Sequence, residues 1–277
     1  MNSLHGIDAG PPHAATVVAR TQESPSIFTL RLRFDDAAAQ AAYRFAPGQF
    51  NMLYLYGVGE VPISVMSDPE EREEIGHTIR AQGRVTLGLA ALKAGDRVGL
   101  RGPFGRGWPL QEMGGCDVVL VTGGLGCAPV VSVIHYVLRR RERFGKLVII
   151  QGVKHAEDLI WHEQYERWAK LPDTQVLVAS SEGAALWPWH VGRVTELFSL
   201  ARFNPERAVA MMCGPEGMMR IAADNLLARG LHESHLYLSM ERNMQCAVGR
   251  CGRTGRARWP ACGSATDGSD CGYRAAR

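Results

Sequence analysis

The sequence lacks several features that would assign a chain to a functional class at once. Residues 249–277 contain no Val, Ile, Leu, Met or Phe, so that stretch cannot build a core of its own and needs a metal, a partner or disorder. The segment MNSLHGIDAGPPHAA has no apolar signal-peptide core, so export is not indicated and we expect a cytoplasmic protein. A net charge of +3 is too small to argue for nucleic acid or an anionic membrane surface as a partner.

Long uncharged runs are scarce as well. Residues 118–138 carry no Asp, Glu, Lys or Arg and precede RRRER, which raises the question of a membrane span. Within that run, VVLVTGGLGCAPVV changes from β-branched residues to a glycine cluster and then to Pro129. Such punctuation is typical of a strand, a tight turn and a helix, so we expect no membrane span.

What remains is an ordinary globular composition. The 277 residues are 46% hydrophobic and 21% charged, which is enough for two domains with separate cores. Seven cysteines in a chain that is not exported indicate reduced thiols or metal ligands more than a disulfide framework.

The pattern predicts a β-barrel followed by an α/β domain and a short tail. In residues 14–112, closely spaced strand-like runs are separated by Gly, Pro and Asp, as in a small antiparallel barrel. In residues 113–234, strands alternate with helices, which predicts a parallel sheet. The helices are expected from about Pro129 to Gly145 and within EDLIWHEQYERWA, RVTELFSLA and EGMMRIAADNLLARG. Residues 235–277 form the cysteine-containing tail, in which HLYLSME is a candidate last strand.

Glycines stand where two of the predicted strands turn into helices. TGGLGCAP (residues 122–129) would let the backbone approach a diphosphate at a helix N-terminus, and MMCGPEGMM (residues 211–219) repeats the arrangement. Either motif alone is equally explained by a simple chain reversal, and Cys213 alone is more often a packing residue.

Two motifs of the barrel region carry polar groups. In GEVPISVMSDP, Pro62 fixes an extended backbone and Ser64 offers a hydroxyl, an arrangement that could meet the edge of a flat ring. In HTIRAQGRVT, Arg80 and Arg84 are candidate diphosphate partners and Thr86 places a hydroxyl near a glycine. Taken singly, each motif is more often a solvated strand or loop.

Together and in this order, the motifs resemble the ferredoxin-NADP reductase superfamily. The matching signatures are PIS at residues 62–64, GPFGRG at 102–107, TGGLGCAP and CGPEGMM, within a resemblance that spans about residues 14–252. The chain is most similar to the branch with a cysteine-rich tail. That branch holds the NiFe hydrogenase/sulfhydrogenase gamma subunit, a subunit of anaerobic sulfite reductase and the electron-transfer subunit of dihydroorotate dehydrogenase.

The resemblance implies an FAD-binding barrel and an NAD(P)-binding domain. By similarity, the flavin ligands would be Pro62, Ile63, Ser64, Thr78, Ile79, Arg80, Gly83, Val85 and Thr86. The nicotinamide nucleotide would contact Gly123, Gly124, Gly126, Cys213, Gly214 and Pro215, with Ser64 and Cys213 as the catalytic residues beside the reacting rings. The superfamily usually has Arg before the proline, where this chain has Val61, so Arg80 or Arg84 must supply the positive charge.

The implied reaction is hydride transfer between nicotinamide C4 and flavin N5, followed by single-electron transfer to an iron-sulfur acceptor. The chain would then be a diaphorase subunit that serves a hydrogenase or a sulfur or sulfite reductase. The alternative is a non-catalytic nucleotide-binding or assembly subunit. Ser180 and Ser181 could accept the 2′-phosphate of NADP, but the carboxylate of Glu182 opposes it, which favours NAD.

The cysteines of the tail leave three interpretations open. Cys246 and Cys251 begin the C-x4-C-x2-C spacing of a plant-type [2Fe-2S] run, but Thr254 stands where the third cysteine belongs. Cys246, Cys251 and Cys262, with Cys271 as a fourth, are candidate ligands for a [2Fe-2S] cluster or for zinc, or else the site is broken. The abrupt loss of aliphatic residues also suggests the hypothesis of a shifted reading frame, which resequencing the gene would test.

Overall fold

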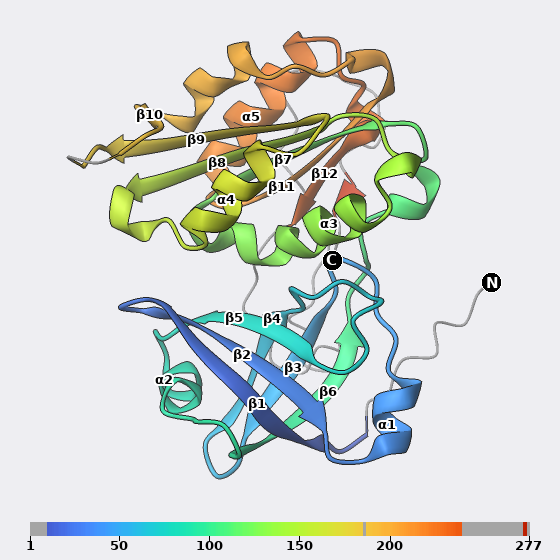
Figure 1. The fold of residues 1–277 in the computed structure, drawn as a ribbon, viewed down its shortest axis with the longest axis vertical. Coiled ribbons are helices and arrows are strands. Elements are labelled where there is room, and N and C mark those ends of the chain that lie inside the picture. The colour runs from blue at the N-terminus through green and yellow to red at the C-terminus, as the bar shows by residue number, and fades with distance from the viewer. Residues whose placement is uncertain (1–9, 185–186, 240–273, 276–277) are drawn as a thin grey trace, which may run out of the picture.

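The computed structural model describes residues 10–184, 187–239 and 274–275, which form two sheets stacked end to end (Figure 1). The first sheet is antiparallel, with the strand order β4-β3-β6-β1-β2-β5. Its strands are β1 (His13–Ser24), β2 (Ile27–Phe34), β3 (Phe50–Leu55), β4 (Gly59–Ser64), β5 (Ile75–Arg80) and β6 (Arg97–Phe104). Two short helices accompany it, α1 (Ala37–Ala42) and α2 (Arg84–Ala90).

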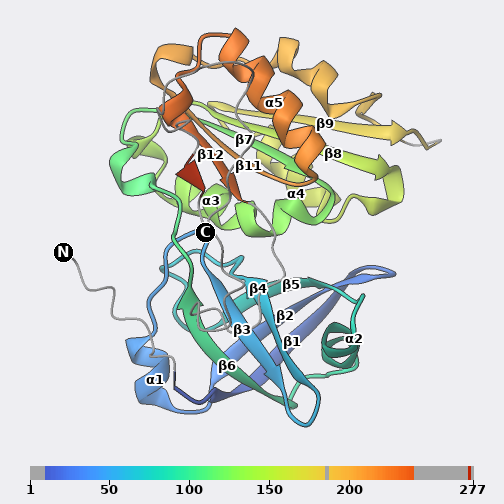
Figure 2. The same cartoon turned by 180° about the vertical axis from the view of Figure 1, so that it is seen from behind.

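The antiparallel sheet rolls up until its two edge strands meet, and Figures 1 and 2 both show β4 beside β5. The backbone N–H of Met66, just after β4, donates to the carbonyl of Gly76 on β5 at 2.9 Å. Alternate residues of the strands point inward and form one core, in which Phe28, Leu30 and Leu53 are fully buried. The predicted antiparallel barrel is confirmed.

The second sheet is parallel throughout, with the order β10-β9-β8-β7-β11-β12-β13. Its strands are β7 (Asp117–Gly123), β8 (Leu147–His155), β9 (Thr174–Glu182), β10 (His190–Val191), β11 (Ala208–Cys213), β12 (Leu236–Ser239) and β13 (Arg274–Ala275). Helices α3 (Ala128–Arg139) and α4 (His162–Ala169) cover one face, and α5 (Glu216–Ala228) covers the other (Figure 2). The predicted α/β architecture is likewise confirmed.

Several helical segments differ from the prediction. The helix expected to reach Gly145 ends at Arg139, because the backbone of Arg140 leaves helical geometry and a 3-10 turn, η3 (Arg141–Arg143), follows. In EDLIWHEQYERWA the helix starts only at His162, after Trp161 in a left-handed conformation. RVTELFSLA forms the 3-10 helix η5 (Val194–Leu200). The other 3-10 turns are η1 (Leu110–Glu112), η2 (Gly124–Cys127), η4 (Ala156–Asp158), η6 (Pro205–Arg207) and η7 (Glu233–His235).

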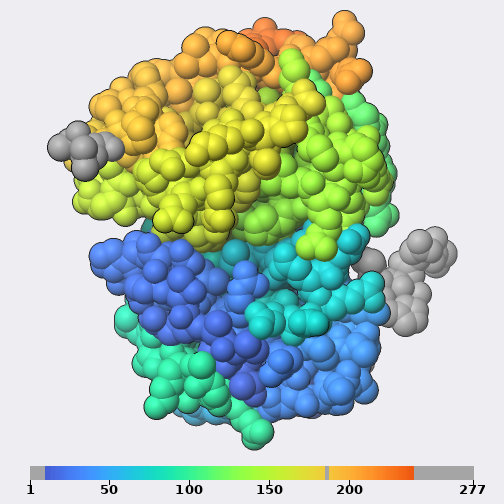
Figure 3. Space-filling model, viewed as in Figure 1, coloured from blue at the N-terminus to red at the C-terminus, as the bar shows by residue number. Residues whose placement is uncertain are grey.

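The division into domains at residues 112/113 and 234/235 stays a prediction. The first position falls between β6 and β7, while β12 lies beyond the second and still pairs with β11. Figure 3 shows the two halves packed directly against each other. Among the described residues, no helix combines the length and the apolar character needed to cross a membrane.

Candidate active site

A cleft of about 740 Å³ lies where the barrel faces the start of α3. That volume falls within the range of small-molecule and cofactor sites, about 300–1,000 Å³. The structure brings to this cleft all nine barrel residues proposed as flavin ligands from the sequence, although they come from three separate stretches. The lining residues are Glu60, Val61, Pro62, Ile63, Ser64, Thr78, Ile79, Arg80, Gln82, Gly83, Arg84, Val85, Thr86, Leu125, Ala128 and Pro129.

The first wall of the cleft is β4, an edge strand of the sheet. Among the residues that the structure describes it pairs with β3 alone, with Pro62 opposite Met52 and Ser64 opposite Phe50. Proline is tolerated in an edge strand because no neighbouring strand requires a hydrogen bond from the N–H that proline lacks. Within the described ranges, the strand thus has no ladder partner on its other side until the chain reaches Ser64 and Met66, where it contacts β5.

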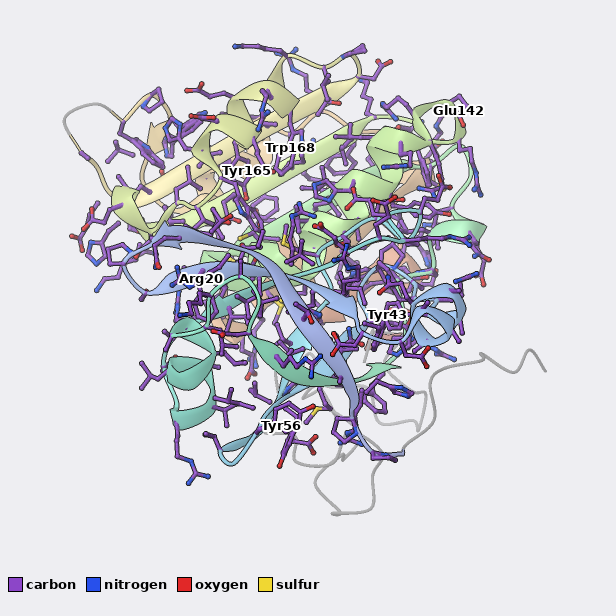
Figure 4. The ribbon with its side chains drawn as sticks, turned by 60° about the horizontal axis from the view of Figure 1, so that its bottom comes forward. Arg20, Tyr43, Tyr56, Glu142, Tyr165 and Trp168 are labelled. Atoms are coloured by element: carbon purple, nitrogen blue, oxygen red, sulfur yellow. The ribbon has the colours of Figure 1, made fainter. Side chains whose placement is uncertain are left out.

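A buried histidine fixes the end of this wall. His77 Nδ1 lies 2.9 Å from the carbonyl oxygen of Ser64, and its Nε2 lies 3.3 Å from Asn51 Nδ2. The Tyr43 hydroxyl in turn lies 3.0 Å from Asn51 Oδ1, and Figure 4 labels Tyr43 in the barrel. The His77 ring is 0% exposed, and this burial lowers its pKa to about 4, so the ring is neutral at pH 7. We did not single out His77 from the sequence, although it directly precedes Thr78.

Two exposed arginines stand at the rim beside the turn that follows β5. Within the described residues, neither Arg80 nor Arg84 forms an ion pair with a carboxylate, so both charges are available to an anion. The Thr86 hydroxyl accepts hydrogen bonds from the backbone N–H groups of Gln82 and Gly83, at 3.0 and 2.9 Å. Thr86 thus holds the turn in shape with its hydroxyl.

The cleft also contains a paired carboxylate that the sequence did not reveal. Arg101 on β6 grips Glu60 with two nitrogens, Nη2 to Oε1 at 2.8 Å and Nε to Oε2 at 3.2 Å. The pair neutralises the only acidic side chain among the described residues of the lining. The wall therefore presents Arg80 and Arg84 as its uncompensated charges.

On the other side, the turns after β7 and β11 press against each other backbone to backbone. A Cβ on Gly126 would lie 2.2 Å from the carbonyl oxygen of Cys213, and a Cβ on Gly214, at φ +154°, would lie 2.9 Å from the Gly123 nitrogen. Glycine is required at both places because a side chain would separate the turns. Gly124 adopts φ +54° with open space around its Cβ position, and Gln151 Nε2 holds its carbonyl at 3.1 Å.

The structure therefore gathers Gly123, Gly124, Gly126, Gly214 and Pro215 at the carboxyl edge of the parallel sheet. Ligands of open α/β sheets bind at this edge, beside the helix N-termini. From the first turn and the start of α3, it is Leu125, Ala128 and Pro129 that reach the cleft itself.

Comparison with known proteins identifies the family to which this chain belongs. The model of the oxidoreductase NAD-binding domain family matches residues 120–224. The sulfhydrogenase 1 gamma subunit of Pyrococcus furiosus is 34% identical over 222 residues, which cover 79% of this chain and 76% of the relative. The sulfhydrogenase 2 gamma subunit of the same organism is 33% identical over 234 residues, covering 80% of each. The chain belongs to the sulfhydrogenase gamma subunit family.

Two further likenesses agree with this assignment. A probable electron transfer subunit of dihydroorotate dehydrogenase B (NAD(+)) from Methanocella arvoryzae is 31% identical over 245 residues, covering 87% of this chain and 83% of the relative. The fold matches a ferredoxin NADP+ reductase from Neisseria gonorrhoeae solved with bound FAD and NADP, with TM-score 0.68, 21% identity and coverage of 82% and 97% of the two chains. The predicted family, fold and class of enzyme, an oxidoreductase, are confirmed.

In this gamma-family chain the predicted catalytic thiol is deeply buried. Cys213 is 1% exposed and belongs to the same core cluster as Cys127 and Tyr165. Burial raises the pKa of Cys127 to about 12 and that of Tyr165 well above its ordinary value. Tyr165 packs edge to face on Trp168, with ring centroids 5.2 Å apart, and Figure 4 labels both residues on α4. A catalytic role for Cys213 stays a prediction.

The residues predicted from the sequence to select the coenzyme lie at the end of β9. Ser180 is buried, and its hydroxyl donates to the Glu182 carbonyl at 2.6 Å, so it is already occupied. The Glu182 carboxylate is exposed and lies 3.0 Å from His155 Nδ1. Ser181 remains exposed.

The predicted metal ligands Cys246, Cys251 and Cys262, and Cys271 with them, lie outside the described residues. In the described part of the chain, no group of three or more His, Cys, Asp or Glu side chains could hold a metal ion.

Proposed function

We propose that this gamma-family chain is a flavin-dependent diaphorase subunit. It moves electrons between NAD(P)H and an iron-sulfur partner such as a hydrogenase or a sulfur reductase. The observation that carries the proposal is the convergence of Pro62–Ser64, Thr78–Arg80 and Gly83–Thr86 on one cleft, which the start of α3 faces from the other half of the molecule.

The cleft fits the chemistry of FAD. Apolar side chains, among them Val61, Ile63 and Val85, suit a flat ring, and the uncompensated Arg80 and Arg84 suit a diphosphate. FAD is bound in the similar ferredoxin NADP+ reductase structure, and in this cleft it would supply a group that takes up a hydride from a nicotinamide and releases electrons singly. Ser64, Thr78 and the backbone of β4 would orient the ring.

The chain's own contribution to the reaction is position and exclusion of water. The Ser64 carbonyl is held by His77, so the β4 wall stays in place. Ala128 and Pro129 cover the cleft from the opposite half. Gly124, whose Cβ position faces open space in the turn after β7, would let the backbone approach a dinucleotide at the start of α3. Such fixed geometry is what hydride transfer between two stacked rings requires.

We also propose NAD as the preferred coenzyme. Glu182 places an exposed carboxylate at the end of β9, where the additional phosphate of NADP would meet repulsion. The Ser180 hydroxyl already donates to the Glu182 carbonyl of its own strand. Of the two serines, Ser181 alone is therefore left to bind the additional phosphate of NADP.

The partner proposal rests on the relatives. The matched relatives are subunits of sulfhydrogenases and of dihydroorotate dehydrogenases, so the family works within larger complexes. We propose a hydrogenase or a sulfur or sulfite reductase as the partner here. A [2Fe-2S] cluster on Cys246, Cys251 and Cys262 would connect the flavin to it, and a cytoplasmic location remains expected from the sequence.

Thr254 favours a second candidate function. Without a third cysteine at that position, the tail lacks the ligand that completes the run. The chain would then be a nucleotide-binding or assembly subunit without an outlet for electrons.

A visible spectrum of the purified protein reconstituted with FAD distinguishes the diaphorase from the nucleotide-binding or assembly subunit. Flavin bands with additional iron-sulfur absorbance, and dye reduction that is faster with NADH than with NADPH, would support the diaphorase and the coenzyme preference. Failure to reduce any dye with either coenzyme would contradict the diaphorase.

A further inference from the structure

Besides the cleft, the two halves meet at an ion-pair cluster. Asp68 follows β4 on the barrel side, and its side chain is 1% exposed. Arg140 Nη1, at the end of α3, lies 2.9 Å from Asp68 Oδ2, and Arg139 Nε lies 3.4 Å from Asp68 Oδ1. Arg140 also binds Glu70 and lies with its guanidinium 3.9 Å from the centre of the Tyr136 ring.

A neutral contact lies one turn earlier on the same face of α3. His135 Nδ1 lies 3.2 Å from the carbonyl oxygen of Met66. Because a carbonyl only accepts, this ring nitrogen carries the proton. His135 and Arg139 are four residues apart, so both point at the segment that follows β4.

These contacts join the same two elements that form the walls of the cleft. β4 supplies Pro62 to Ser64 to the cleft and runs directly on to Met66 and Asp68. Helix α3 supplies Ala128 and Pro129 at its start and Arg139 at its end, about 18 Å away for its 12 residues. Because α3 is rigid, contacts that hold its C-terminal end to the segment after β4 also fix the distance between its N-terminal end and β4.

The fastening is stronger than a surface ion pair. Asp68 has lost its water, and the Arg140 side chain is only 13% exposed. Exposed pairs contribute little, whereas removal of one partner from a buried pair leaves a charge without compensation. Asp68 Oδ1 also accepts the backbone N–H of Glu70 at 2.9 Å, which holds the carboxylate in its orientation.

We propose that Asp68, Arg140 and His135 form a clasp that sets the width of the cleft and so the distance between a bound nicotinamide and the flavin. They are positioning residues, since none lines the cleft. The inference rests on the proposed function, but its first measurement does not need a flavin.

The first measurement is hydrogen exchange of residues 66–76 in the full chain. Arg140→Met removes the guanidinium and keeps an apolar stem, while Arg140→Lys keeps the charge. Arg97→Met is the matched control, because Arg97 pairs with Asp35 within the barrel at 3.1 Å and away from α3. We expect exchange in residues 66–76 to become at least tenfold faster in Arg140→Met and to stay within twofold of wild type in Arg97→Met. Unchanged exchange in Arg140→Met would overturn the clasp.

The second measurement separates positioning from binding. In the FAD-loaded protein, we expect Arg140→Met to slow flavin reduction at saturating NADH by about tenfold or more, since a 1 Å misplacement can cost about 100-fold. The KM for NADH and the affinity for FAD should stay within about twofold, and Arg140→Lys should recover most of the rate. An undiminished rate in an Arg140→Met protein whose exchange has increased would contradict the positioning role. If the wild-type protein binds no FAD, the proposed function is wrong. The hydrogen-exchange measurement would still decide whether the clasp exists.

Discussion

His77 Nδ1 and the carbonyl oxygen of Ser64 are 2.9 Å apart, which ties β5 to β4 at the point where the barrel closes. Since the carbonyl accepts, Nδ1 carries the proton and Nε2 offers its lone pair to the amide of Asn51, at 3.3 Å. The Tyr43 hydroxyl lies 2.8 Å from Asn51 Nδ2, from which it accepts, and 3.0 Å from Asn51 Oδ1, and burial raises the pKa of Tyr43. This buried chain of hydrogen bonds links β5 and the Tyr43 segment to β4, and it supports the wall proposed to hold the flavin.

The low pKa of His77 predicts a loss of stability in acid. The folded protein keeps the ring neutral down to a pKa of about 4, while the unfolded chain protonates near the ordinary value of 6.5. Stability from this residue is complete above the unfolded value and is lost as the pH falls from there towards 4. The total is roughly 3 kcal/mol.

Urea unfolding at pH 7 and pH 4.5 measures this effect. From pH 7 to pH 4.5, the free energy of unfolding should fall by about 2 kcal/mol less in His77→Asn than in the wild type. The asparagine cannot titrate, but it can still donate to the Ser64 carbonyl. Wild-type pH dependence in that variant would show that His77 is not the group responsible.

Removal of Arg101 should weaken FAD binding. Glu60 would keep a negative charge without its partner in the same cleft as the proposed diphosphate. We expect a Kd about tenfold higher in Arg101→Met, which corresponds to about 1.4 kcal/mol, measured by flavin fluorescence. The double variant Arg101→Met/Glu60→Gln should recover the affinity, and a double variant as weak as the single would argue against this explanation.

The rim arginines should distinguish FAD from riboflavin. Arg80→Met and Arg84→Met each remove one charge-assisted contact to a phosphate, so FAD should bind about tenfold more weakly to each. Riboflavin has no phosphate and its affinity should not change. Arg33→Met, an exposed arginine of β2 outside the cleft, serves as the control. Equal losses for both ligands would mean that the arginines shape the cleft and do not bind phosphate.

Gly126→Ala should impair binding of the nicotinamide nucleotide alone. The new methyl group would meet the Cys213 carbonyl oxygen at 2.2 Å and force the two glycine turns apart. We expect a Kd for NADH at least tenfold higher with FAD affinity within twofold, by calorimetric titration. Gly114→Ala, where nothing lies within 4 Å, should leave both unchanged. Normal NADH binding by Gly126→Ala would exclude this turn from the coenzyme site.

The sequence could predict the parts of the site that depend on local pattern. Short stretches of the sequence are enough to recognise the glycine turns after β7 and β11, the Pro62–Ser64 wall and the alternation of strands with helices. Helix α2 escaped prediction because it is short and contains Gly88, a residue unfavourable within helices. The early end of α3 was missed because Arg140 leaves the helix to bind Asp68, 72 residues away in the chain.

The pairings of Glu60 with Arg101 and of His77 with Ser64 were hidden for a similar reason. Partners 41 and 13 residues apart meet only once the sheet has rolled up, and no spacing rule connects them. Burial of the Cys213 thiol likewise depends on packing by α3 and α4, which a strand-end motif does not specify.

Titration of the flavin-free protein with FAD, followed by NADH under anaerobic conditions, tests the central claim most directly. We expect the protein to retain equimolar FAD and its yellow colour to bleach on addition of NADH, faster than with NADPH. A protein that retained neither FAD nor FMN, and bound neither pyridine nucleotide, would contradict the account.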